Sequence, residues 1–181
     1  MKTDIENLEY RMYGLVPYNL SDIQKGIQFQ HAVTEYMVEH DNQYNDKRKT
    51  PLGKWSRLDK TSIILNGGTT NDSAKDGLPI GDLNRHEITL LSKAPSTSIS
   101  VFTEPDLGNQ LTAIVFLVDE RVWNKKKYPD FNVDTKSLSS PPILSGLDKQ
   151  IKQWKSKFSS DENIQDEIVF LRSFLTQFKL A

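Results

Sequence analysis

Residues 19–37 read Asn-Leu-Ser-Asp-Ile-Gln-Lys-Gly-Ile-Gln-Phe-Gln-His-Ala-Val-Thr-Glu-Tyr-Met. Ser21 and Gln24 have the spacing of a capping box, in which the two side chains satisfy free amide groups at the start of a helix. The stretch therefore predicts a helix over residues 21–40, and the elements around it are placed relative to that helix.

The apolar side of this helix is interrupted by polar side chains. Ile23 and Ile27 lie one turn apart, and His31 continues the stripe that is expected to pack on the domain. The polar groups are either satisfied inside the protein or line a pocket. A histidine in this place is more often a hydrogen-bonded core residue than a catalyst.

Short apolar runs typical of strands occupy residues 11–16, 61–65, 98–102 and 111–118, and a second helical pattern occupies 83–94. This alternation predicts parallel strands joined by right-handed crossovers, with the last strand returning antiparallel after a short connection. The predicted fold class is α/β: a small mixed sheet of about four strands, three parallel and one antiparallel, flanked by helices.

The length of 181 residues fits one domain with an extension. We expect an α/β core over residues 1–122, a linker over 123–146 and a helical extension over 147–181. Two amphipathic patterns, the second preceded by a capping-box pair at Ser159 and Glu162, predict that the extension is a helical hairpin. Its apolar stripes pack on the sheet, on each other or, less favoured, on a protein partner.

Composition excludes several classes of protein. Cysteine is absent, the first residues lack an apolar leader, and the longest apolar run, 113–118, is too short to span a membrane. We therefore expect a cytoplasmic protein with no membrane span. The net charge of −1 argues against a generally basic surface, and the basic stretch 46–60 is expected to be a solvated loop rather than a nucleic-acid contact.

Three polar segments follow the carboxyl ends of the predicted parallel strands: residues 17–25, 66–72 and 104–110. Open α/β sheets bind ligands at that edge. Asn, Asp, Gly and Pro are also what ordinary turns are made of, so each segment alone has a structural explanation. The coincidence of three segments favours a binding site.

Two motifs resemble the type II peptidyl-tRNA hydrolases. Residues 27–32, Ile-Gln-Phe-Gln-His-Ala, resemble that family's Ala-Gln-x-x-His-Ala helix, and Asp106-Leu107-Gly108 resembles its Asp-Ala-Gly loop. The resemblance covers residues 12–118. The run from Tyr-Asn-Leu-Ser to His-Ala is also similar to uncharacterised proteins of large bacteriophages, so the chain resembles a divergent, phage-type member.

The resemblance implies a mixed-sheet α/β fold and hydrolysis of the ester that joins a peptide to the terminal ribose of tRNA, without metal or cofactor. Gln28, His31 and Asp106 match the family's motif positions. The family has a lysine where this chain has Gln24, and Lys25 is the adjacent substitute. The further residues expected to bind the ligand are Asn19, Gln24, Asn66, Thr69, Thr70, Glu104, Gly108, Asn109 and Gln110.

A second hypothesis is a non-catalytic binding or adaptor protein on the same fold, such as a phage-encoded host modulator. It would use the C-terminal helices and the basic stretch 46–60 to hold a protein partner. The first hypothesis instead requires tRNA or a nucleotide-like ligand, and either one is compatible with a homodimer.

Overall fold

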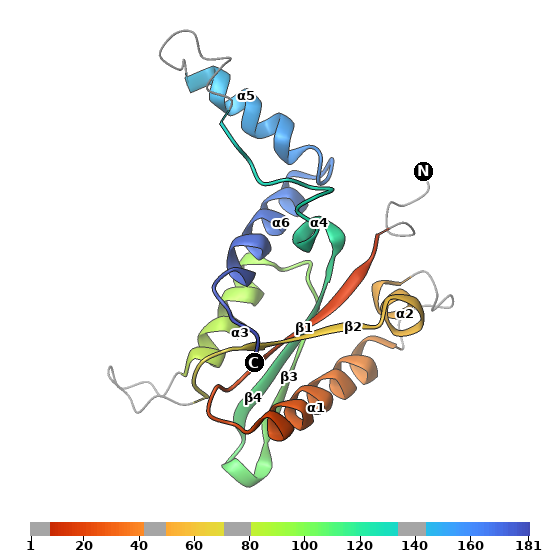
Figure 1. Ribbon diagram of the computed structural model, residues 1–181, viewed down its shortest axis with the longest axis vertical. Helices are drawn as coiled ribbons and strands as arrows, with labels where there is room; N and C mark the ends of the chain where they lie inside the picture. The colour runs from red at the N-terminus through yellow and green to blue at the C-terminus, as the bar shows by residue number, and fades with distance from the viewer. Residues whose placement is uncertain (1–7, 42–49, 71–80, 134–143) are drawn as a thin grey trace.

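The computed structural model describes residues 8–41, 50–70, 81–133 and 144–181 (Figure 1). The elements in these ranges are β1 (Tyr10–Val16), α1 (Asp22–Asp41), α2 (Pro51–Lys54), a π-helical turn η2 (Trp55–Asp59), β2 (Thr61–Asn66), α3 (Asp82–Lys93), β3 (Ile99–Glu104), a 3₁₀ turn η3 (Pro105–Leu107), β4 (Gln110–Asp119), α4 (Glu120–Trp123), α5 (Leu144–Lys155) and α6 (Glu162–Leu175).

The four strands form one mixed sheet in the order β2-β1-β4-β3. The prediction that three strands pair in parallel is wrong. Only β1 and β2 form a parallel pair, and β4 pairs antiparallel with both β1 and β3. β4 lies beside β3 because it returns from β3 through the η3 turn, and its other side pairs with β1. Since β4 is antiparallel to both neighbours, β1, β2 and β3 end at the same edge of the sheet.

Helices cover both faces of this sheet, so the core has three layers (Figure 1). Alternate residues of a strand point to opposite faces. On β1, Met12 and Val16 belong to the cluster that packs under α1 and α2, while Tyr13 and Leu15 belong to the cluster that packs under α3 and α6. Two hydrophobic clusters therefore share one sheet.

The rotation of α1 differs from the sequence prediction. The stripe that contains Ile23 and Ile27 faces solvent, with 78% and 46% of these side chains exposed. The buried face carries Gln28, Phe29, Ala32, Val33 and Tyr36. A close approach sets this rotation, because the Phe29 ring occupies the space that a side chain at Gly14 would need on β1.

The C-terminal segment contributes to the core. Ile168, Leu171 and Phe174 of α6 belong to the same buried cluster as the sheet residues that pack against α3. Beyond α6, the chain returns to the edge of β2, where the Asn66 N–H donates to the Lys179 carbonyl at 2.9 Å. α5 instead projects away from the sheet at one end of the molecule (Figure 1).

Two local details correct the sequence prediction. The basic stretch 46–60, expected to be a solvated loop, contains α2, which starts because the Thr50 hydroxyl accepts from the Gly53 N–H at 3.0 Å and Pro51 fits the first helical turn. The part of that stretch over 46–49 lies outside the described residues. At α6 the capping residue is Asp161, whose carboxylate accepts from the Asn163 N–H at 2.9 Å, and not Ser159.

In the described part of the chain, no helix is both long and apolar enough to cross a membrane.

Candidate functional site

Gln28 of α1 is the most constrained polar side chain at the predicted site. It is 8% exposed, its amide nitrogen donates to Glu104 Oε2 at 2.7 Å, and its amide oxygen accepts from the Thr112 hydroxyl at 2.6 Å. The Thr112 hydroxyl also lies 3.3 Å from the Phe102 carbonyl, but its one proton favours the shorter contact. The Gln28 amide is thus held at both ends.

α1 lies along β3 and runs in the opposite direction. The Ser100 hydroxyl bonds the Glu39 carboxylate near one end, and Gln28 bonds Glu104 near the other. The η3 turn, which carries Asp106, follows Glu104 directly. It lies at the same end of the molecule as the start of α1 (Figure 1). We call this region, which includes Lys25, Gln28, His31, Glu104 and Asp106, the α1–β3 edge.

His31 lies on the surface of the α1–β3 edge, three residues after Gln28. Its ring is exposed and packs edge-on against Phe102, with ring centroids 4.6 Å apart. The expectation of a hydrogen-bonded core histidine is therefore wrong, because the rotation of α1 turns this position outward. An imidazole held by an aromatic ring and open to solvent can reach a bound water or ligand.

Gln24 and Lys25 have different surroundings at the start of α1. The predicted capping box is present: Gln24 Oε1 accepts from the Ser21 N–H at 3.0 Å, and the Gln24 N–H donates to the Ser21 hydroxyl at 3.3 Å. This use of Gln24 fixes the helix end. The Lys25 side chain is 13% exposed, and its ammonium lies 3.6 Å from Asp22 Oδ1.

The η3 turn presents the predicted loop residues to solvent. Asp106, Gly108 and Asn109 are exposed, and Gln110 is half-buried at the start of β4. Gly108 and Asn109 both have positive φ angles, 68° and 60°, which glycine and asparagine tolerate better than other residues. Two successive left-handed residues therefore turn the chain sharply behind the Asp106 carboxylate.

Thr69 and Thr70 tie the loop after β2 to its neighbours. The Asp82 carboxylate accepts from the Thr69 N–H and hydroxyl, both at 2.9 Å, and these bonds lower the pKa of Asp82. The Thr70 hydroxyl donates to the Leu111 carbonyl at 2.7 Å. Both predicted ligand-binding threonines thus make structural hydrogen bonds. The loop after β1, which holds the exposed Asn19, joins this loop through a bond from the Tyr18 N–H to the Gly68 carbonyl.

Asn66 lies beside a pocket that is separate from the α1–β3 edge. Its amide oxygen accepts from the Gly68 N–H at 3.1 Å. Asn66, Gly68, Asp82 and His86 line a pocket of about 370 Å³ together with the C-terminal tail. Burial lowers the pKa of His86 in this pocket, against the opposing effects of Asp82 and a hydrogen bond with the Gly67 backbone. Asn66 therefore lines this pocket beside α3 and the tail, while the motif residues lie along α1 and β3.

Thr112 and Phe102 are functional candidates that the sequence motifs did not indicate. Thr112 is fully buried and binds Gln28, while Phe102 supports His31. A signal for Thr112 was present, since it is the one hydroxyl in the apolar run 111–118. A buried hydroxyl needs a partner, and the amide of α1 is that partner.

Within the described ranges, no cluster of three or more His, Cys, Asp or Glu side chains is placed to hold a metal ion.

The sequence matches no protein-family model and no curated protein at a significant level. The resemblance to type II peptidyl-tRNA hydrolases therefore stays a prediction from two short motifs. The residues of the α1–β3 edge carry the functional argument.

Proposed function

We propose that this chain is a peptidyl-tRNA-hydrolase-like protein that binds the acylated end of tRNA at the α1–β3 edge and hydrolyses its ester. The observation that carries the proposal is the fixed Gln28 amide beside the exposed His31, next to the turn that presents Asp106. Ester hydrolysis needs an activated water, a donor for the developing oxyanion and a group that holds the leaving ribose.

Each role has a candidate at this edge. His31 takes a proton from the water that attacks the ester carbonyl carbon, and the Lys25 ammonium stabilises the oxyanion. The bond from that carbon to the ribose oxygen then breaks, and the proton passes from His31 to the ribose oxygen. Asp106 holds the neighbouring ribose hydroxyl. The products are a peptide with a free carboxylate and an uncharged tRNA.

Gln28 acts in this scheme as a positioning residue. An amide nitrogen carries two hydrogens, and the bond to Glu104 uses one of them. Because the amide is held by Glu104 of β3 and Thr112 of β4, it fixes α1 against the two strands that the η3 turn joins. His31 and Asp106, which belong to different elements, thereby keep a constant relationship.

The experiment measures release of the acyl group from N-acetyl-aminoacyl-tRNA by the purified chain. We expect His31→Ala to reduce release at least tenfold. Gln30→Ala is the matched control, because Gln30 is also exposed on α1 but points about 100° away from His31. Equal rates for the two variants would contradict the assigned role of His31.

Exposed apolar side chains favour the adaptor as a second candidate. Ile23, Ile27 and Leu107 are at least 46% exposed around the α1–β3 edge. Large exposed apolar groups gathered in one region are typical of a protein interface. An adaptor would be indifferent to Asp106→Asn, whereas a hydrolase would lose turnover with that change.

A further inference from the structure

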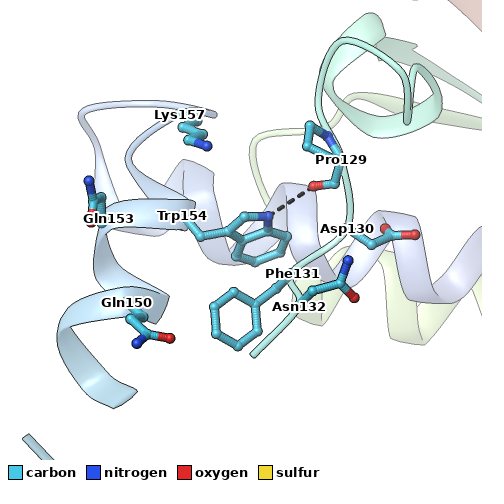
Figure 2. Close-up of a pocket in the computed structure, with 8 residues that line it drawn as sticks. All are labelled: Pro129, Asp130, Phe131, Asn132, Gln150, Gln153, Trp154 and Lys157. Carbon is cyan, nitrogen blue, oxygen red and sulfur yellow. Dashed lines mark hydrogen bonds between the residues drawn. The ribbon is translucent and has the colours of Figure 1, made fainter. Parts of the chain in front are cut away.

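A pocket of about 440 Å³ lies between α5 and the segment 129–132 (Figure 2). It is separate from the α1–β3 edge, and none of its residues belongs to the motifs that resemble the hydrolases. Its lining is Pro129, Asp130, Phe131, Asn132, Gln150, Gln153, Trp154 and Lys157. The pocket thus combines two aromatic rings with amide groups and charged groups.

Trp154 presents a fixed aromatic surface in this pocket. Its indole nitrogen donates to the Pro129 carbonyl at 2.9 Å, and its ring packs edge-on against Phe158 with centroids 4.7 Å apart. Phe131 lies beside it at 5.5 Å, with the two ring planes 58° apart. Figure 2 shows the indole reaching from α5 towards the facing segment. A held indole that is half-exposed is suited to stacking on a planar group.

The facing wall is held by a buried arginine. Arg172 of α6 is 6% exposed and bonds the Val122 carbonyl at 3.2 Å and the carbonyls of Tyr128 and Pro129. Its guanidinium also lies 3.4 Å from Asp130 Oδ1. Because these bonds fix the backbone before Phe131, the wall of the pocket is built into the fold.

Charge in this region favours an anionic ligand. Residues 144–157 contain four lysines and one aspartate, although the whole chain has a net charge of −1. Lys152 and Lys155 pair with Glu162 and Asp166. In the described part of the chain, no carboxylate lies within ion-pair distance of Lys157, which is exposed at the rim of the pocket.

The one carboxylate that lines the pocket is already compensated. Asp130 lies 2.8 Å from the Lys125 ammonium and 3.4 Å from the Arg172 guanidinium. An incoming phosphate near Lys157 therefore meets a neutralised Asp130 rather than a free negative charge. The amide side chains of Asn132 and Gln153 also line the rim and can both donate and accept hydrogen bonds.

We propose that this pocket binds a nucleotide unit of single-stranded RNA. The base stacks against Trp154 beside Phe131, the amide side chains bond the edge of the base, and Lys157 binds the phosphate. Aromatic stacking together with lysine contacts is how proteins hold unpaired nucleotides. The proposal is independent of ester hydrolysis, because it uses no residue of the α1–β3 edge.

The test measures fluorescence anisotropy of a labelled 12-nucleotide oligouridylate with the full chain at low salt. We expect saturable binding that weakens about tenfold in Trp154→Ala and severalfold in Lys157→Gln, with a smaller loss in Trp154→Phe, which keeps an aromatic ring but lacks the bond to Pro129. Lys93→Gln is the matched control, since Lys93 is exposed on α3 and loses the same charge. Circular dichroism verifies that each variant is folded, and Lys157→Gln leaves the aromatic packing intact.

Adenosine monophosphate as a competitor distinguishes a free nucleotide from a strand. If adenosine monophosphate displaces the oligouridylate at a concentration near the oligouridylate's own dissociation constant, the pocket is a mononucleotide site. If it does not displace the oligouridylate, the pocket is a site for the strand. No binding by the unaltered chain would overturn the proposal and leave the α5 surface to a protein partner. Equal binding by Lys157→Gln, Trp154→Ala and Lys93→Gln would overturn it as well.

Discussion

The Gln28 amide nitrogen donates to Glu104 Oε2 at 2.7 Å and so joins the N-terminal half of α1 to the last residue of β3, 76 positions later in the chain. The same amide accepts from the buried Thr112 hydroxyl of β4. One side chain of α1 therefore contacts both of the strands that the η3 turn joins. Its replacement is expected to change both the stability of the core and the geometry of the α1–β3 edge.

Gln28→Glu puts a second carboxylate beside Glu104 and removes the donor between them. We expect the free energy of unfolding at pH 7 to fall by about 3 kcal/mol, because the half-buried Glu104 carboxylate loses its donor and gains a like charge beside it. Urea unfolding measures the change. The double variant Gln28→Glu/Glu104→Gln exchanges donor and acceptor, and we expect it to recover most of the loss. Additive losses in the double variant would contradict the pairing.

Gly14→Ala tests the contact that sets the rotation of α1. A Cβ at this position overlaps the Phe29 ring, so we expect a loss of about 1–3 kcal/mol in the free energy of unfolding. Gly26→Ala is the matched control. A Cβ there meets nothing within 4 Å, and alanine in place of glycine inside a helix is expected to add about 1 kcal/mol of stability. Changes of the same sign in both variants would contradict the packing described.

The half-buried His86 predicts a loss of stability in mild acid. Burial lowers its pKa in the folded chain, so the unfolded chain binds the proton first as pH falls through the ordinary histidine range near 6.5. The free energy of unfolding should therefore fall from pH 7 towards pH 5. His86→Gln should remove that slope.

The further fall in the free energy of unfolding at lower pH, where Asp82 is protonated, provides an internal control. Hydrogen bonds from Thr69 lower the pKa of Asp82, so its contribution is present above the ordinary aspartate range and is lost as pH falls through the lowered value. His86→Gln should keep this second loss. A profile unchanged by His86→Gln between pH 7 and 5 would show that His86 is not the titrating group.

Arg172→Met tests whether the buried guanidinium holds the segment before α5. It removes the donor to three backbone carbonyls, and we expect a loss of about 3 kcal/mol in the free energy of unfolding. Lys125→Met is the control, because Lys125 also pairs with Asp130 but is exposed. Exposed ion pairs contribute about 0–1 kcal/mol, so a comparable loss in both variants would contradict this role.

The local pattern of the sequence was sufficient to predict the elements of the core, but not their pairing. The apolar density of 111–118 marks β4, yet apolarity is the same whether a strand lies at an edge or between two others. The position of β4 depends on contacts with β1 that are remote in sequence. The crossover between β1 and β2 predicts that these two strands pair in parallel. The crossover between β2 and β3 does not predict that β3 pairs with β4 rather than with β2.

The face of α1 could have been predicted from a different signal. Ile23 and Ile27 outweigh Ala32 and Val33 in hydrophobicity, so the apolar stripe gives the wrong rotation. The informative residue is Gly14, since a glycine inside an apolar strand indicates that another element approaches closely. On α1 the side chain that makes this approach is Phe29.

The location of the candidate site could be predicted from the sequence, but the contacts among its residues could not. The motif placed Gln28 and His31 on one helix and Asp106 on the turn after β3. Glu104 was expected to bind a ligand, and the structure shows that it binds Gln28. The sequence does not distinguish these uses, because a carboxylate accepts from an amide of the protein as readily as from a ligand.

The central claim is that the α1–β3 edge acts on the acylated end of tRNA. Its most direct test compares the unaltered chain with Asp106→Asn for release of the labelled acyl group from N-acetyl-aminoacyl-tRNA, with unfolding free energies measured for both. We predict release well above the rate without protein, and a loss of at least tenfold in Asp106→Asn at unchanged stability, because Asp106 is exposed. No release by the unaltered chain in excess over the tRNA, or equal release by the two proteins, would contradict the claim.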